Sequence, residues 1–173
     1  MKVTPLYLDT CIFVAYYYDK DSRNKHQRII DCLEKLKSHK NIQLVTSDFT
    51  FTEFLRIVKK LKGFSMKKGY KIVNELTRLN KIGKKYQFKM VEGEDIENAK
   101  EYTLNDFFVS LQEEILNQKK EIGIPDSIHI VVMRNNKLKN ILTFDTNNGF
   151  NNIKKINAIN PNDIDDFITK ISK

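Results

Sequence analysis

Several features are scarce or missing in this sequence, and each absence excludes a class of protein. Only two of the 173 residues are cysteines, Cys11 and Cys32. They form no CxxC pair and no Cys/His cluster has zinc spacing, so we expect free thiols in a reducing compartment. Neither GxGxxG nor GxxxxGK[ST] occurs, which excludes the common dinucleotide and P-loop sites.

Long hydrophobic runs are missing as well. The first residues, MKVTPLYLD, contain no apolar stretch long enough for a signal peptide. No run elsewhere approaches the length of a transmembrane helix. We therefore expect a cytoplasmic protein that has no membrane partner.

Linkers rich in Pro, Gly or Ser, internal repeats and low-complexity tracts are also missing, which predicts one domain over residues 1–173. Hydrophobic residues make up 40% of the chain and charged residues 30%, as in a globular protein with a proper core. The formal net charge is +8. This charge favours polyanionic partners, nucleic acid first and acidic membranes second. A lysine-rich surface that only aids solubility is an equal alternative.

The hydrophobic pattern alternates between short strands and helices. Apolar runs rich in β-forming residues predict strands at Leu6–Asp9, Ile42–Thr46, Tyr86–Val91, Asn140–Phe144 and Lys155–Ala158. Helical spacing predicts helices between them. The pattern is typical of an α/β protein with a mostly parallel central sheet of about five strands flanked by helices. Two helical elaborations are expected, around residues 63–85 and 94–123, the second with two helices.

Four carboxylates are predicted to meet at the carboxyl edge of this sheet, where doubly wound folds bind ligands. Two of them follow strands, one lies at or near the start of a helix after the second strand, and one lies in the first turn of a later helix. In chain order they are Asp9, Glu53, Asp126 and Asp145. Pro125 suits the first position of the helix that carries the third acid.

Each acid also has a purely structural interpretation. An acid at a helix start can cap the helix or complement its dipole. Glu53 can close a capping box with Thr50 or pair with Arg56. Four such coincidences at one sheet edge are less probable than any single one, and clustered carboxylates repel one another unless a cation compensates. The hard ions that prefer carboxylates, Mg²⁺ or Mn²⁺, are the natural cofactors, and such a centre hydrolyses phosphodiesters.

The stretches that carry these acids resemble the PIN-domain nucleases, and most closely the VapC-type toxin ribonucleases. The matching motifs are YLDTCIF, TSDFTFTEFLR, PDSIHIVVM and LTFDTNNGF. The resemblance implies a three-layer PIN-like fold and a Mg²⁺- or Mn²⁺-dependent endoribonuclease, a hydrolase that acts on RNA. It implies catalytic and metal-binding roles for all four acids, with Thr10 and Thr143 as supporting residues. It also implies a small antitoxin partner and a homodimer. Asn148 stands where some relatives carry a further acid.

Basic residues near these motifs are candidates for binding RNA. The closest in sequence to the second acid are Arg56, Lys59 and Lys60, and a lysine-rich helical segment adds Lys67 and Lys68. A solvated helix face is the alternative for that segment. His129 lies three residues after Asp126 and can point toward the site, although a hydrogen-bonded packing histidine is the preferred interpretation.

The leading hypothesis is therefore a metal-dependent ribonuclease, either a toxin or an RNA-processing relative. A non-catalytic RNA- or partner-binding module on the same fold is the main alternative.

Overall fold

The computed structural model describes residues 3–20, 24–91, 104–117, 123–146, 150 and 153–172. The elements run along the chain as β1 (Thr4–Leu8), α1 (Thr10–Tyr17), α2 (Lys25–Lys37), β2 (Ile42–Ser47), α3 (Asp48–Val58), α4 (Met66–Leu79), β3 (Lys81–Ile82), β4 (Tyr86–Gln87), β5 (Lys89–Val91), α5 (Leu104–Asn117), α6 (Ile124–Asn135), β6 (Asn140–Leu142), β7 (Asn157–Ile159), the 3₁₀ helix η2 (Pro161–Asp163) and α7 (Ile164–Ile171). Within the described ranges, every helix is too short or too polar to cross a membrane.

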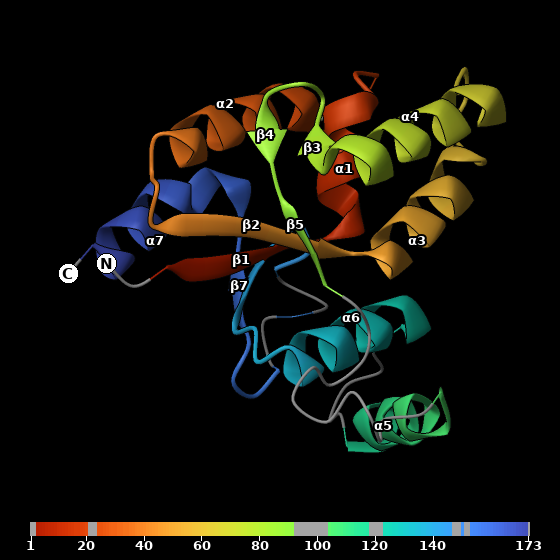
Figure 1. Cartoon of the computed structure of the whole chain (residues 1–173), viewed down its shortest axis with the longest axis vertical. Coiled ribbons are helices and arrows are strands. Elements are labelled where there is room, and N and C mark those ends of the chain that lie inside the picture. The colour runs from red at the N-terminus through yellow and green to blue at the C-terminus, as the bar shows by residue number, and fades with distance from the viewer. Residues whose placement is uncertain are drawn as a thin grey trace.

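The central sheet has five strands in the order β5-β2-β1-β6-β7, and all of its neighbouring strands are parallel. The first strand of the chain is therefore the middle strand of the sheet. In Figure 1, α1, α2 and α7 lie on one side of the sheet, and α5 and α6 lie on the other. The predicted α/β fold with a parallel five-stranded sheet between helices is confirmed.

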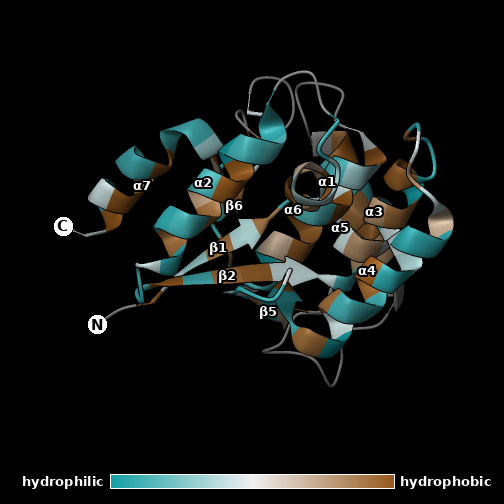
Figure 2. Cartoon of the chain, turned by 90° about the horizontal axis from the view of Figure 1, so that it is seen from above, coloured by the Kyte–Doolittle hydropathy of each residue, from teal (hydrophilic) through white to brown (hydrophobic). Residues whose placement is uncertain are grey.

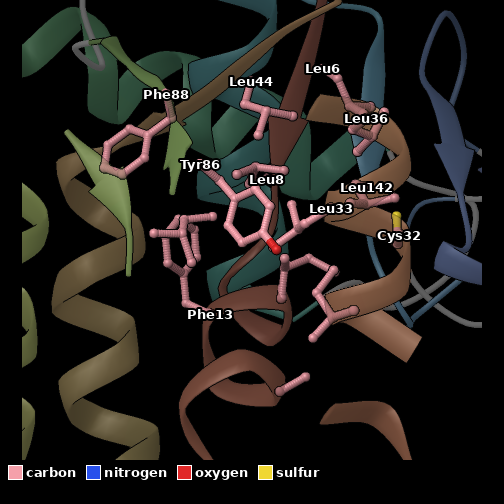
Figure 3. Packing of buried hydrophobic residues seen from close by; sticks show 14 of the residues in the cluster. Leu6, Leu8, Phe13, Cys32, Leu33, Leu36, Leu44, Tyr86, Phe88 and Leu142 are labelled. Carbon is pink, nitrogen blue, oxygen red and sulfur yellow. The ribbon is translucent and has the colours of Figure 1, made fainter. Parts of the chain in front are cut away.

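The alternation of side chains along β1 explains why both faces of the sheet are covered. Leu6 and Leu8 point into a core shared with residues of α1, α2, α3 and α4, whereas Tyr7 points into a second core shared with α6. All three side chains are fully buried. Teal and brown alternate along α2 and α7, as expected for helices that bury only one face (Figure 2). Figure 3 shows the first core, where Leu8 lies among Leu33, Leu44 and Tyr86.

The segment predicted as one strand at Tyr86–Val91 is two strands. Its first part, β4, pairs antiparallel with β3 in a separate hairpin, and its second part, β5, pairs parallel with β2. Phe88 lies between them, and its backbone N–H donates to the carbonyl of Asn80 at 2.9 Å. Both ends of the predicted segment are therefore extended, but each end pairs with a different strand.

The last strand begins two residues later than the predicted Lys155–Ala158. Lys155 has φ of 71°, a left-handed conformation that a strand does not allow, so β7 covers Asn157–Ile159 instead. The strands β1 and β6 also end earlier than predicted, at Leu8 and Leu142.

The two predicted elaborations differ in outcome. Around residues 63–85 the chain forms α4 and then begins the β3–β4 hairpin, so this insertion is not purely helical. For residues 94–123 the structure describes one helix, α5, and the second predicted helix lies outside the described residues. The single-domain assignment stays a prediction.

Candidate metal centre

Asp9 lies at the junction between β1 and α1, in the N-cap position of the helix, but its side chain does not cap the helix. Its Oδ2 atom instead accepts hydrogen bonds from the Thr143 hydroxyl at 2.6 Å and the Cys11 thiol at 2.9 Å. Burial and the charge of Asp9 raise the pKa of Cys11, which keeps the thiol protonated as a donor. Asp9 is 6% exposed, and the structural interpretation of this acid as a helix cap is wrong.

Glu53 is in the second turn of α3 rather than near its start. The helix begins at Asp48, directly after β2, with Ser47 as its N-cap residue. The proposed capping box with Thr50 is therefore wrong, since Thr50 lies inside the helix and accepts from Thr46 at 3.0 Å. The proposed pair with Arg56 is confirmed, with 3.0 Å between the Arg56 guanidinium and Glu53 Oε1.

The other carboxylate oxygen of Glu53 faces the interior. Its Oε2 atom accepts from the Thr10 hydroxyl at 2.7 Å and lies 3.0 Å from Nε2 of His129. Burial raises the pKa of Glu53, but the hydrogen bonds from His129 and Thr10, the charge of His129 and the Arg56 hydrogen bond outweigh burial and lower it to about 2. Glu53 is therefore held as a carboxylate.

His129 is completely buried and lies beside both of these acids. Its Nε2 atom is 3.7 Å from Asp9 Oδ1 and 3.2 Å from the Thr10 hydroxyl oxygen, and its Nδ1 atom is 2.8 Å from the hydroxyl of Tyr7. The interpretation as a packing histidine explains the burial and the satisfied ring nitrogens but misses the position at the centre. The signal was its spacing, because a residue three positions after Asp126 shares a helix face with it.

Asp126 lies in the first turn of α6 as predicted, and Pro125 is the second residue of the helix rather than the predicted first. Burial and the charges of Asp9, Asp145 and Glu53, partly offset by His129, together raise the pKa of Asp126 to about 6. Each of the other three acids therefore lies within electrostatic reach of Asp126.

Asp145 is exposed and follows β6 by three residues. Its backbone N–H donates to the Thr143 hydroxyl at 3.0 Å, and that hydroxyl in turn donates to Asp9. Thr143 thus connects the chain after β6 to the acid after β1. Asn148 lies outside the described residues.

The basic residues predicted to bind RNA are more widely spread than the acids. Arg56 contacts Glu53, as described above. Lys59 and Lys60 are exposed, and they directly follow the last residue of α3, Val58. Lys67 and Lys68 are exposed in the first turns of α4, where the Lys68 ammonium lies 4.8 Å from the centre of the Phe64 ring.

The residues present fit a divalent cation. Asp9, Glu53 and His129 each place one ligand atom within 4.8 Å of the others, and Asp126 adds a third, half-buried acid. Carboxylates and an imidazole nitrogen are ligands that divalent metals accept in proteins. The carboxylates of Asp9 and Glu53 also accept hydrogen bonds from neighbouring side chains. Such donors fix the orientation of a carboxylate that binds a metal.

Comparison with known proteins identifies both a family and a set of similar folds. A sequence model of the PIN domain matches residues 6–156. No curated protein matches the chain in sequence.

Solved structures resemble the chain over most of its length. VapBC2 of Rickettsia felis, solved with a DNA fragment from its promoter, has a TM-score of 0.58 and 16% identity and covers 91% of this chain and 98% of its own. VapC20 of Mycobacterium tuberculosis, a toxin that cleaves the sarcin-ricin loop, has a TM-score of 0.53 and 16% identity, with 82% and 91% covered. FitAcB of Neisseria gonorrhoeae has a TM-score of 0.53 and 16% identity, with 90% and 97% covered. At such identity the likeness concerns the fold.

Proposed function

This chain belongs to the PIN domain family, and from that premise we propose that it is a divalent-metal-dependent endoribonuclease that hydrolyses RNA phosphodiesters. PIN domains are generally nucleases that depend on divalent metals. The catalytic and metal-binding residues would be Asp9, Glu53, Asp126 and Asp145, with Thr10 and Thr143 in support. The single observation that carries the proposal is the convergence of Asp9, Glu53 and His129, each with one ligand atom within 4.8 Å of the others. Such a site suits a divalent cation such as Mg²⁺ or Mn²⁺.

Each residue contributes to this chemistry through the contacts described above. Asp9 and Glu53 would hold the ion, since each has one oxygen directed toward the centre. Thr143 and Cys11 fix the carboxylate of Asp9, and Thr10 fixes that of Glu53. A bound divalent ion supplies a nucleophilic water at neutral pH and neutralises charge on the phosphate.

RNA would be bound by basic residues on α3 and α4. Phosphate contacts from lysine and arginine provide affinity without sequence preference. The candidates are Arg56, Lys59, Lys60, Lys67 and Lys68. Because Arg56 already pairs with Glu53, a phosphate bound to Arg56 would lie close to the metal centre.

We further infer a toxin of a toxin–antitoxin pair that acts in the cytoplasm, or an RNA-processing relative. The similar folds of VapBC2 and VapC20 support this, as does that of FitAB, solved with a DNA fragment. The expected partners are RNA, a small antitoxin and a second copy of the chain. Exposed apolar side chains on α5 offer a surface for such contacts, namely Phe108, Val109, Ile115 and Leu116.

Cleavage of a mixed single-stranded RNA by purified protein tests the nuclease proposal. The assay compares Mg²⁺, Mn²⁺ and EDTA, and compares the native chain with Asp9→Asn and Asp126→Asn. Asp166→Asn is the matched control, because Asp166 is an exposed acid on α7, at the far end of the sheet from the centre (Figure 1). We expect metal-dependent cleavage by the native chain and the control, and a loss of at least about 10³-fold in the other two.

Two results would contradict the proposal. Cleavage that persists in Asp9→Asn would remove the assigned site. RNA binding without cleavage by protein shown to be free of a partner would favour the non-catalytic binding module instead. Toxicity on expression, relieved by a copurifying small protein, separates a toxin from a processing enzyme.

A further inference from the structure

The neighbours of His129 assign it a direct role at the centre. We propose that Nε2 of His129 is itself a metal ligand, together with Asp9 and Glu53, so that the ion sits in a mixed carboxylate–imidazole site that favours Mn²⁺ over Mg²⁺. The inference rests on the metal dependence proposed above and adds a nitrogen ligand to the acids.

The distances between the three side chains suit one shared ion. Metal–ligand bonds of about 2.1 Å separate adjacent ligand atoms by about 3.0 Å and opposite ligand atoms by about 4.2 Å. Nε2 lies 3.0 Å from Glu53 Oε2 and 3.7 Å from Asp9 Oδ1. All three ligand atoms lie within 4.8 Å of one another, so one cation can contact them together after a small closure of the site.

The chemistry around Nε2 also favours a cation. Its neighbours are two carboxylate oxygens and the hydroxyl oxygen of Thr10. The single hydroxyl proton of Thr10 is donated to Glu53, so the Thr10 oxygen offers only lone pairs toward His129. Without an ion, a proton on Nε2 can satisfy these oxygens, as in the hydrogen bond to Glu53 described above. When Nε2 gives up that proton, several electron-pair donors converge on one small volume, and a divalent ion satisfies them.

The opposite side of the ring has the support that a ligating histidine needs. A histidine that binds a metal through one nitrogen generally donates its other N–H to a nearby oxygen, which fixes the tautomer. Nδ1 lies 2.8 Å from the hydroxyl of Tyr7, and that hydroxyl lies 2.7 Å from Oγ of Ser47. Tyr7 can therefore accept from His129 and donate to Ser47, and the ring of Phe49 packs 5.1 Å from the imidazole.

The expected consequence is a shift in metal preference. Mg²⁺ prefers oxygen ligands, whereas the transition-metal ions, of which Mn²⁺ is one, bind imidazole nitrogen more readily. A nitrogen ligand therefore raises the affinity for Mn²⁺ more than the affinity for Mg²⁺.

Pulsed electron paramagnetic resonance of the Mn²⁺-loaded full chain tests the assignment without altering the protein. The chain has three histidines, His26, His39 and His129, and labelling them with ¹⁵N replaces any ¹⁴N modulation from a histidine ligand. His129→Gln identifies which histidine is responsible, and His39→Gln is the control, since His39 lies in the turn after α2. Tyr7→Phe keeps the buried ring and removes the partner of Nδ1.

We expect a histidine nitrogen signal in the native chain and in His39→Gln, and its loss in His129→Gln. The Kd for Mn²⁺ should rise at least about tenfold in Tyr7→Phe and His129→Gln, with a smaller rise for Mg²⁺. Bound Mn²⁺ without a histidine nitrogen signal would overturn the inference and leave His129 as a hydrogen-bond donor to Glu53. If the same preparation still cleaves RNA, the proposed function stands while the inference fails. Absence of Mn²⁺ binding by the native chain would overturn both.

Discussion

Asp9 and Glu53, the inner acids, are 6% and 8% exposed, and each accepts hydrogen bonds from fixed donors on neighbouring elements. Asp126 and Asp145, the outer acids, are more exposed and come from a helix start and a strand end. One acid of each pair also has a shifted pKa, and the two shifts have opposite directions. Despite burial, hydrogen bonds lower that of Glu53 to about 2, whereas burial and neighbouring charges raise that of Asp126 to about 6.

This difference separates two tasks within one centre. The inner acids are oriented by the protein alone, because fixed donors satisfy their carboxylate oxygens, and the lowered pKa of Glu53 keeps that acid ionised. Asp126 stays ionised at low pH only if a cation offsets its neighbours. The fold therefore fixes Asp9 and Glu53 in advance, whereas the charge of Asp126 depends on the bound ion.

The largest expected effect compares one acid from each half. Glu53→Gln should lower the rate of RNA cleavage by at least about 10³-fold, because it removes a preorganised charge. Asp145→Asn should lower it by about ten- to a hundredfold, because Asp145 is exposed and its charge acts through solvent rather than in a buried site. Single-turnover cleavage at saturating Mn²⁺ measures both rates. Equal losses in the two variants would contradict the division into inner and outer acids.

A smaller effect should follow from loosening an inner acid without removing it. Thr143→Val is nearly isosteric and deletes the hydroxyl that donates to Asp9. We expect the Kd for Mn²⁺ to rise about ten- to a hundredfold, as is typical when a supporting partner of a metal ligand is lost. Titration calorimetry measures the affinity, and Thr169→Val on α7 is the control, because the Thr169 hydroxyl bonds the carbonyl of Asp165. An unchanged affinity in Thr143→Val would mean that Asp9 needs no such support.

The smallest expected effect is a change of the unfolding free energy with pH, caused by Asp126. The pKa of Asp126 is about 6 in the folded chain, where burial raises it, against 3.8 for the unconstrained side chain. The unfolded chain therefore releases this proton first, so the contribution to folding is full below about pH 4 and is lost as pH rises through 6. With EDTA present, we expect a decrease of about 1–2 kcal/mol in unfolding free energy over that range, after allowance for partial exposure.

Urea unfolding at fixed pH values measures this decrease. Asp126→Asn should abolish it, and saturating Mn²⁺ should do the same in the native chain, whereas Asp166→Asn should retain it. A slope that persists in Asp126→Asn would assign the titration to another group.

The sequence alone predicted the acids whose position depends on local structure. Asp9 and Asp145 follow apolar strands, and Pro125 marks the helix start beside Asp126. Glu53 stays a predicted site residue, but the helix that carries it was predicted to begin too late. Its first turn, from Asp48 to Phe51, contains residues whose intrinsic preference for helix is modest, and β2 leads into it without a loop.

Features that depend on distant partners were not predictable in the same way. His129 reaches the centre because Tyr7 and Phe49, far away in sequence, fix its ring. The apolar run around Phe88 forms two strands because its first part pairs with β3 and its second part pairs with β2. Local periodicity indicates that such residues are buried, but not which neighbour they meet.

The place of β1 in the sheet has a consequence for how the protein is made. This strand is synthesised before the other four strands of the sheet, yet it becomes the middle strand, and its neighbour β6 is more than 130 residues later in the chain. Pairing over such a distance is slow, because a long loop must close before the contact forms. The acids of the inner half are synthesised early and those of the outer half late. A nascent chain therefore cannot assemble the complete centre until residue 145 has been added and the parallel sheet has closed around β1.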